Sequence, residues 1–422
     1  MTPMRDQEPG RPADAERRLS TKEAAELLGV KPETVYAYVS RGQLSSRRAP
    51  GGRGSTFDAD EVQALARRNR RGGGTDPAAG GELSVRTRIT LIDGDRYYFR
   101  GIDAVELAER HTYEEVAEWL WTGTLRPGVT FAAPETSVAV ARRAVDALPE
   151  HAGPADRLRV AVIAAATADP LRFDLAEEAV LGTARTLLPT LVAALPTVRR
   201  DHVDDGPLAH RLWARLSGWP ADEAGLRALD LALGLLADHD LAASTLAVRV
   251  AASARAHAYA AVSAGLGVIE GPLHGAAGGL AHKMLLEVLD QGSAAPVVAG
   301  ELRAGRRVPG LGHRLYSGED PRARALFAAL EEIPRAAPAL AAARDVAATA
   351  ARHAPLHPNV DLALAVLTAS SGMPATAGET IFAVARTAGW IAHALEEYAE
   401  RPLRMRPRGH YTGPRPPRPL PE

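Results

Sequence analysis

Between residues 104 and 289 the sequence consists almost wholly of helical segments, and this constrains the fold more than any other feature. Apolar residues recur every three or four positions, as in the run 138–148, and Pro and Gly separate one segment from the next. Several segments are apolar on most faces, which is typical of helices buried inside a multi-helix body. With only 5% aromatic residues and many alanines and leucines, the composition also suits helices better than sheets. We therefore predict an all-α body.

Charge and composition exclude several classes of protein. The 50 Lys and Arg residues nearly balance the 51 Asp and Glu residues, so net charge indicates no partner. There is no cysteine, which excludes disulfides and thiol chemistry. The N-terminus lacks the apolar core of a signal peptide, and no apolar run reaches the ~18 residues of a membrane helix. Metal-ligand spacings such as HExxH are missing. We expect a metal-free, cytoplasmic protein of more than one domain.

The first 71 residues predict a small separate domain after a disordered segment, 1–16. Ser20 and Glu23 form a capping box for one helix, and a second helix is expected over 33–41. The glycine-rich run 47–57 is typical of a wing, and Asp58 and Glu61 are expected to cap a third helix. Residues 17–71 therefore resemble the winged helix-turn-helix domains of the excisionase and MerR type. A glycine-rich linker, 72–83, follows.

The charge of this domain favours contact with duplex DNA. Residues 17–71 hold 12 Lys and Arg against 6 Asp and Glu, a net charge of +6, while the whole chain is −1. A basic module on an acidic body is typical of a nucleic-acid footprint. The alternative is a module that only docks or dimerises. The candidate DNA-binding residues are Thr34, Tyr36, Tyr38 and Arg41 of the second helix, and Arg47, Arg48 and Arg53 of the wing.

Two histidines flanked by glycines are the strongest chemical signals in the remainder of the chain. His274 lies in the run 271–279, Gly-Pro-Leu-His-Gly-Ala-Ala-Gly-Gly, at or just before the start of a helix. There the helix dipole disfavours the imidazolium, so the ring stays neutral and can donate to a developing oxyanion. His313 lies in the run 309–316, Pro-Gly-Leu-Gly-His-Arg-Leu-Tyr. Alone, each histidine is more often structural.

The motifs that follow these histidines in order point to one family. The carboxylate and guanidinium groups come from Asp320-Pro-Arg322, from Asn359-Val-Asp361 and from Arg386. Together with 237–245 and 406–413, these motifs strongly resemble the citrate synthase family over about residues 84–413. A β-hairpin signal at 85–103 also matches the opening of that domain. The resemblance implies a two-lobed helical fold, with a small lobe at about 276–380 and a Pro/Arg-rich tail at 414–422.

The resemblance also assigns catalytic roles. Asp361 would remove a methyl proton from acetyl-CoA, His274 would donate to the enol oxygen, and His313 would polarise the oxaloacetate carbonyl. The residue types fit independently, because a buried aspartate has a raised pKa and is a stronger base. Without the other motifs, Asp361 would be read as part of an Asn-Val-Asp helix cap. No cofactor is implied, since acetyl-CoA is a substrate.

Substrate binding is assigned in the same way. Guanidinium groups bind carboxylates through two parallel hydrogen bonds, which suits the dicarboxylate oxaloacetate. By resemblance the residues are Arg322, Arg386 and Arg406, with His239. In the family the last arginine crosses the interface of a homodimer, so we expect a dimer with shared sites. Arg306 and Arg307 are candidates for the CoA phosphates.

Two departures from the family leave the acyl substrate open. Ala242 and Gly278 stand where many members have Asn, and both losses remove hydrogen-bonding groups near the substrate pocket. The expected reaction is acetyl-CoA + oxaloacetate + water to citrate + CoA. The alternatives are 2-methylcitrate synthesis from propionyl-CoA and a DNA-binding regulator whose enzyme-derived domain senses a ligand.

Overall fold

The chain divides into two compact units after Val85, and each is described by itself. The computed structural model describes residues 18–28, 30–40, 44–48, 55–63, 65, 85–199, 206–271, 274–275, 277–316, 318–407, 410–414 and 418. The expected disordered segment 1–16, the linker 72–83 and most of the tail 414–422 lie outside these residues and stay predictions.

The N-terminal unit is built from short helices packed on a small antiparallel sheet. Its elements are β1 (Arg18–Ser20), α1 (Thr21–Leu28), α2 (Pro32–Ser40), β2 (Ser46–Arg48) and β3 (Ser55–Asp58), and the strand order is β1-β3-β2. Strands β2 and β3 form the predicted wing, whereas β1 was not predicted. Leu19, Val35, Phe57 and Val62 are buried in its core.

Helix caps in this unit follow local sequence signals. The capping box is confirmed, because Ser20 N–H donates to the Glu23 carboxylate at 2.8 Å and Ser20 Oγ accepts from Glu23 N–H. Asp58 Oδ1 accepts from two backbone N–H groups at the start of the helical stretch 59–63. The prediction for Glu61 is wrong: its carboxylate binds Ser45 instead of the cap. Helix α2 spans 32–40 rather than the predicted 33–41.

The second unit opens with a small sheet and continues as helices, as predicted. Its strands are β4 (Thr90–Asp93), β5 (Arg96–Phe99) and β6 (Ile102–Asp103). The β4–β5 register pairs Asp93 with Arg96 and places Gly94 and Asp95 at the turn, which confirms the hairpin expected within 85–103. The helices are α4 (Ala104–Arg110), α5 (Tyr113–Thr122), α6 (Glu135–Asp146), α7 (Pro154–Ala168), α8 (Glu177–Ala194), α9 (Leu208–Leu216), α10 (Glu223–Leu236), α11 (Ala243–Ser253), α12 (Ala258–Ile269), α13 (Ala277–Gln291), α14 (Ala294–Arg303), α15 (Pro321–Glu331), α16 (Ala337–Ala351), α17 (Val360–Ser370) and α18 (Ala377–Ala399), with a 3-10 turn, η1 (Pro334–Ala336).

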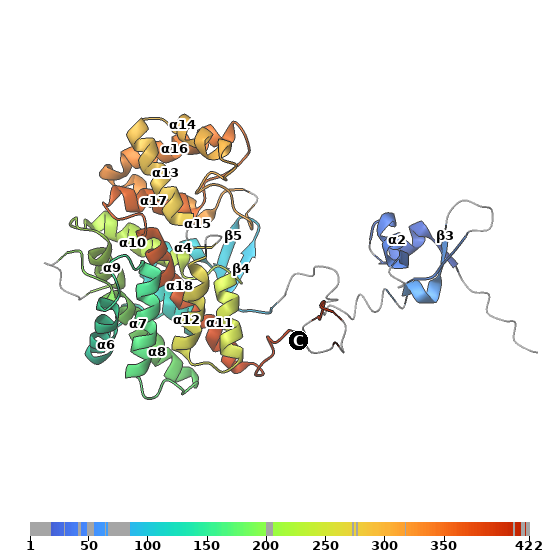
Figure 1. Ribbon diagram of the computed structural model, residues 1–422, viewed down its shortest axis with the longest axis horizontal. Coiled ribbons are helices and arrows are strands. Elements are labelled where there is room, and N and C mark those ends of the chain that lie inside the picture. The colour runs from blue at the N-terminus through green and yellow to red at the C-terminus, as the bar shows by residue number, and fades with distance from the viewer. Residues whose placement is uncertain are drawn as a thin grey trace, which may run out of the picture. The chain divides into compact units, whose positions relative to one another are not determined.

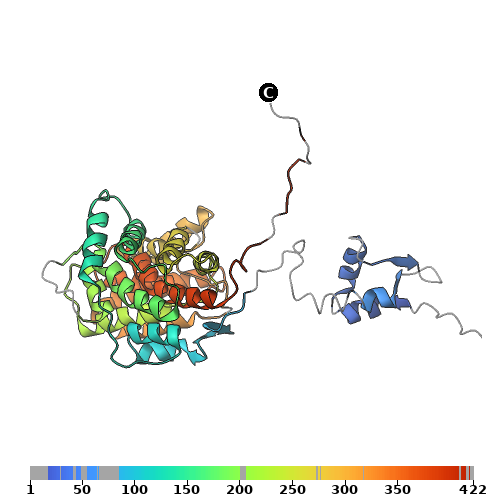
Figure 2. The same cartoon turned by 90° about the horizontal axis from the view of Figure 1, so that it is seen from below.

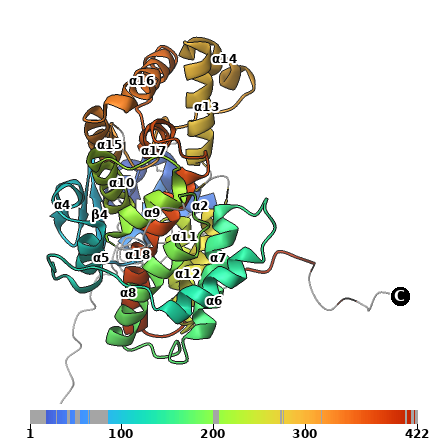
Figure 3. The same cartoon turned by 90° about the vertical axis from the view of Figure 1, so that its left-hand side faces the viewer.

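The helices form two lobes. Helices α13, α14, α16 and α17 pack on one another at the top of the body in Figure 1, and α15 packs on both α17 and α10. In the larger lobe below, α18 packs against α5, α7, α8, α10, α11 and α12. Helix α18 runs through the middle of this larger lobe in two perpendicular views (Figures 1 and 2). Figure 3 shows α13 and α14 standing clear of the larger lobe. Among the residues that the structure describes, no helix has the length and apolar character needed to cross a bilayer.

A glycine in the middle of α18 brings a loop close to this central helix. A Cβ atom at Gly389 would lie 2.4 Å from the Ala237 carbonyl oxygen and 2.5 Å from an oxygen of Asp238. Because glycine has no Cβ, Gly389 N–H can donate to the Ala237 carbonyl oxygen at 3.0 Å. The residue after Asp238 is the predicted substrate histidine, so this contact fixes the base of its loop.

Candidate active site

His274 lies in a tight loop three residues before α13. This loop lies so close to the end of α12 that a Cβ at Gly275 would be 2.3 Å from the Ile269 carbonyl oxygen. His274 Nε2 lies 2.7 Å from Ser244 Oγ, which also accepts from Trp390 Nε1 at 3.3 Å. With Trp390 as donor, the hydroxyl proton of Ser244 is free to go to Nε2, leaving the imidazole proton on Nδ1. Burial, aided by the charge of Arg386, lowers the pKa of His274 to about 4, so the ring is neutral.

His313 faces hydrogen-bond donors on both ring nitrogens. Nδ1 accepts from Leu315 N–H at 3.1 Å, and Nε2 lies 3.2 Å from Nη2 of Arg322. A neutral imidazole has only one lone pair, so it cannot accept from both. When Nδ1 accepts from Leu315 N–H, the ring proton lies on Nε2. This N–H makes no hydrogen bond to Arg322, which is also a donor, so it can donate to a ligand. Burial and the charge of Arg322 lower the pKa of His313 to about 4.

His239 and Arg322 complete a cluster around His313. The rings of His239 and His313 are 5.3 Å apart in an edge-to-face arrangement, and His239 Nε2 lies 2.7 Å from the Tyr316 hydroxyl. Burial and Arg322 lower the pKa of His239 well below its usual value. Arg322 is itself buried, and its guanidinium donates two hydrogen bonds to the Asp320 carboxylate, at 2.8 and 3.0 Å, which hold the guanidinium plane.

Asp361 lies in the first turn of α17, next to the His313 loop. Asn359 caps this helix, accepting from Asp361 N–H, and its Nδ2 donates to Gly312 O at 2.9 Å. The cap therefore also ties the start of α17 to the loop that carries His313. Burial raises the pKa of Asp361 to about 6, because desolvation outweighs the opposing charge of Arg322.

Arg386 projects from α18 with one unused donor. Its Nε donates to Leu236 O at 2.9 Å and its guanidinium lies 4.6 Å from the Phe382 ring centroid, while its buried Nη2 has no hydrogen-bond partner. Burial lowers its pKa to about 10, so the group stays charged near neutral pH. Because a buried charged donor without a partner is costly, this nitrogen is suited to an anionic ligand. His274 packs on the same Phe382 ring, 6.0 Å between centroids.

The structure thus brings most of the predicted site residues together and leaves three apart. His239, His313 and Arg322 share direct contacts, and His274 and Arg386 share Phe382. Asp361 adjoins this group, because the preceding Val360 N–H donates at 3.0 Å to Asp320, the carboxylate that binds Arg322. Arg306, Arg307 and Arg406 are exposed, and Arg306 is paired with Glu301 at 2.7 Å.

The two departures from the family pattern have different surroundings. Ala242 is the N-cap residue of α11 and makes no side-chain cap hydrogen bond. Gly278 faces Gly378, where an added Cβ would make only ordinary contacts of 3.8 to 4.0 Å. A small side chain would fit beside Asp361 at this position.

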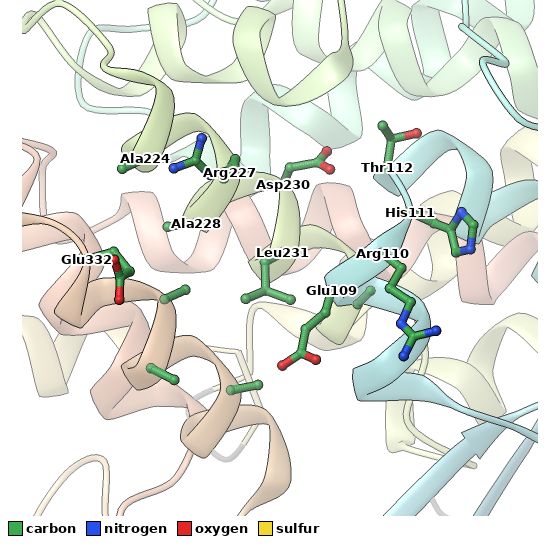
Figure 4. Close-up of a pocket in the computed structure, with 14 residues that line it drawn as sticks. Glu109, Arg110, His111, Thr112, Ala224, Arg227, Ala228, Asp230, Leu231 and Glu332 are labelled. Carbon is green, nitrogen blue, oxygen red and sulfur yellow. The ribbon is translucent and has the colours of Figure 1, made fainter.

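A pocket of about 470 Å³ lies away from these residues. It is lined by residues from α4, α10 and α15 and from the turns that follow α4 and α15, including Glu109, Arg110, Asp230 and Glu332 (Figure 4). None of the predicted site residues lines it. We therefore do not assign the chemistry to this pocket, although burial raises the pKa of Asp230 there to about 7.

The candidate DNA-binding residues are only partly described. Tyr36 and Arg47 are exposed, and Thr34 is half-buried. Tyr38 packs against the hydrophobic core, so it is less available to a ligand than predicted. Arg41, Arg53 and the side chain of Arg48 lie outside the described residues.

Sequence reasoning missed several residues that hold the site. Ser244 contacts His274, and Tyr316 contacts His239. Asp320, quoted only as part of a motif, fixes Arg322. A buried aspartate next to the substrate histidine, Asp238, was also overlooked. All four lie in runs that carry the family resemblance, 237–245, 309–316 and 320–322, but no feature of the sequence assigned them a role.

His274 and His313 lie on loops before α13 and α15, while Arg322, Asp361 and Arg386 lie on α15, α17 and α18. This arrangement within a two-lobed helical body is that of an acyltransferase of the citrate synthase type. The citrate synthase C-terminal domain family matches residues 79–408, and a helix-turn-helix domain family matches residues 18–70. The chain belongs to the citrate synthase family and has an N-terminal helix-turn-helix domain.

The relatives that match this chain carry the names of two enzymes. Citrate synthase of Haloferax volcanii is 34% identical over 359 residues, 79% of this chain and 94% of that protein. The protein 2-methylcitrate synthase 2 of Corynebacterium glutamicum is 30% identical over 346 residues, 75% of this chain and 88% of that protein. The crystal structure of citrate synthase from Pyrobaculum aerophilum matches with a TM-score of 0.66 at 25% identity, covering 89% of this chain and 97% of that one. These matches agree with the predicted family and fold.

Proposed function

We propose that the protein condenses acetyl-CoA with oxaloacetate and hydrolyses the product to citrate and CoA. The observation that carries this proposal is the pairing of a base with raised pKa, Asp361, with two histidines held neutral, His274 and His313. Enolisation next to a thioester needs a base and a neutral hydrogen-bond donor for the oxygen. The same three groups act in sequence below.

Asp361 takes a proton from the acetyl methyl group, and the C–H electron pair forms the enol double bond. His274 Nδ1–H donates to the enol oxygen as negative charge develops there. The enol carbon then attacks the keto carbon of oxaloacetate, while His313 Nε2–H donates to the keto oxygen. The Nε2 proton of His313 passes to the keto oxygen, which becomes the hydroxyl of the citryl thioester. Water then attacks the thioester carbonyl carbon and the C–S bond breaks. The proton held by Asp361 and the two water protons restore His313, protonate the CoA thiolate and leave with the ionising product carboxyl group.

We propose that oxaloacetate is bound by groups whose hydrogen-bond donors are not all used within the protein. The unpartnered Nη2 of Arg386 binds one carboxylate, and Arg322 contributes from the cluster with His239. Arg406, exposed beyond α18, reaches the site of the partner subunit in a homodimer. Arg306 and Arg307 remain proposed contacts of the CoA phosphates.

Identifying the product by mass spectrometry tests which acyl group is used. Acetyl-CoA yields citrate and propionyl-CoA yields 2-methylcitrate, and the two substrates differ by one methylene, about 1 to 3 kcal/mol of discrimination. We expect citrate to dominate when both thioesters are supplied equally. If 2-methylcitrate predominates, the protein is a 2-methylcitrate synthase that performs the same chemistry with propionyl-CoA.

The pH profile of kcat/KM for acetyl-CoA should follow Asp361. The carboxylate acts only when ionised, and its pKa is raised to about 6, so activity should fall about tenfold per pH unit below 6. The two histidines, with pKa values of about 4, stay neutral over that range. Initial rates between pH 4.5 and 8 measure the profile. A flat profile down to pH 5 would argue against Asp361 as the base.

For the N-terminal domain we propose weak binding to duplex DNA that catalysis does not require. With about three phosphate contacts, affinity should fall about 40-fold between 50 and 200 mM salt, as fluorescence anisotropy with a labelled duplex would show. Arg47→Ala should reduce the salt slope by about one.

Deleting residues 1–80 should abolish this binding and leave condensation nearly intact. If the protein does not bind DNA even at low salt, the domain is a docking module. If the deletion abolishes activity, the domain is a structural part of the enzyme, contrary to this proposal.

A further inference from the structure

A chain of buried ionic contacts starts next to the substrate histidine. Asp238, which precedes His239, accepts from Thr90 Oγ1 at 2.5 Å and from His393 Nε2 at 3.3 Å. His393 Nδ1 in turn accepts from Arg249 Nη1 at 2.7 Å. Because Nδ1 accepts from a guanidinium, the proton lies on Nε2 and points to Asp238. All three side chains are buried.

The network of ionic contacts continues to the end of α18. Arg249, with 1% of its side chain exposed, pairs with the fully buried Glu397 at 3.2 Å and with Glu396 at 2.8 Å. Glu397 also accepts from Arg404 Nη2 at 2.8 Å, and Arg404 is 24% exposed. Buried charges are costly unless each is matched, so the chain holds its members in one arrangement.

The outer end of this network of ionic contacts fixes the turn that carries Arg406. Leu403 N–H donates to Ser253 O at 2.7 Å, and Arg406 N–H donates to Leu403 O at 3.2 Å. Leu403 has a positive φ of 59°, a conformation that a leucine keeps only where surrounding contacts impose it. Arg404, between these residues, supplies the ionic contact.

The carbonyl groups at the end of α18 are held as well. Arg255 donates to the carbonyl oxygens of Tyr398 at 2.6 Å and Glu400 at 2.7 Å. The direction in which the chain leaves α18 is therefore set by the α11–α12 turn and by Glu397.

We propose that Arg404 is a positioning residue for oxaloacetate, which acts by fixing the turn that presents Arg406. The proposal rests on the proposed function, in which Arg406 binds oxaloacetate in the partner subunit. Arg404 itself touches no substrate. Its loss removes the ionic contact that holds the turn, while the hydrogen bond from Leu403 to Ser253 and the pair of Arg249 with Glu397 remain, so the turn loosens and the fold is retained.

Steady-state kinetics of the full-length Arg404→Met variant test this. We expect KM for oxaloacetate to rise about tenfold, with KM for acetyl-CoA unchanged and kcat within about threefold, because the loosened arginine must be ordered on each binding event. Arg404→Lys should recover part of the loss. Arg401→Met, an exposed arginine in the same segment, is the matched control and should behave as wild type. Thermal melts report whether the variants fold.

A double-mutant cycle separates positioning from general destabilisation. In the Arg406→Ala background, Arg404→Met should change KM for oxaloacetate no further, because both act through one contact. An equal additional increase in that background would overturn the inference, as would an unchanged KM in Arg404→Met beside a raised KM in Arg406→Ala. If Arg406→Ala leaves KM unchanged, the proposed role of Arg406 fails and the inference fails with it.

Discussion

Replacing Asp361 by Asn should lower kcat by about 10² to 10⁴, the usual contribution of a positioned general base. Asparagine keeps the size of the side chain and the packing of α17, but it cannot accept the methyl proton. Oxaloacetate binding should persist, because the proposed contacts come from Arg322, Arg386 and His239. Steady-state thiol release measures the first effect and calorimetry with oxaloacetate the second.

Asp290→Asn serves as the control for this experiment. Asp290 is an exposed carboxylate of α13 in the same lobe, so its neutralisation should leave kcat unchanged. If Asp361→Asn retains wild-type kcat, the proposed base is wrong. Lost activity together with lost oxaloacetate binding would instead indicate a misfolded site.

At oxaloacetate concentrations far below the KM of Arg406→Ala, mixing two nearly inactive variants should restore activity if the sites are shared between subunits. Arg406→Ala removes the arginine proposed to reach the partner, and His274→Ala removes the proposed enol-oxygen donor. In a mixed dimer, one site combines an intact His274 with an intact Arg406 from the other subunit. Random exchange would give about a quarter of the wild-type activity, since half the dimers are mixed and each holds one complete site.

Subunit exchange must be verified, for example by native mass spectrometry of differently tagged chains. Under verified exchange, a mixture that stays as inactive as both parents contradicts the shared site. Arg406 would then act in its own subunit or outside oxaloacetate binding.

Short-range features of this fold could be predicted from sequence. The capping box of Ser20 and Glu23 spans four residues, so its contacts follow from local geometry. The glycine-flanked loops of His274 and His313 carried enough family pattern to propose both residues as site candidates. Helix periodicity likewise predicted the all-α body.

Contacts between distant helices could not be predicted in this way. The hydroxyl of Ser244 reaches His274 only because of how α11 packs beside the loop before α13. The pairing of Arg249 with Glu397 joins residues 148 positions apart. Neither pair has a local pattern, since both depend on tertiary packing. The proposed role of Arg406 depends further on a second subunit.

The most direct test of the proposed chemistry is oxaloacetate-dependent release of free thiol from acetyl-CoA by the full-length protein. We expect rapid release with both substrates and almost none when oxaloacetate is omitted, because the enol needs the keto carbon as its acceptor. Thiol release at the same rate without oxaloacetate would show a thioesterase. No release with either acetyl-CoA or propionyl-CoA would contradict the condensation and favour a ligand-sensing regulator.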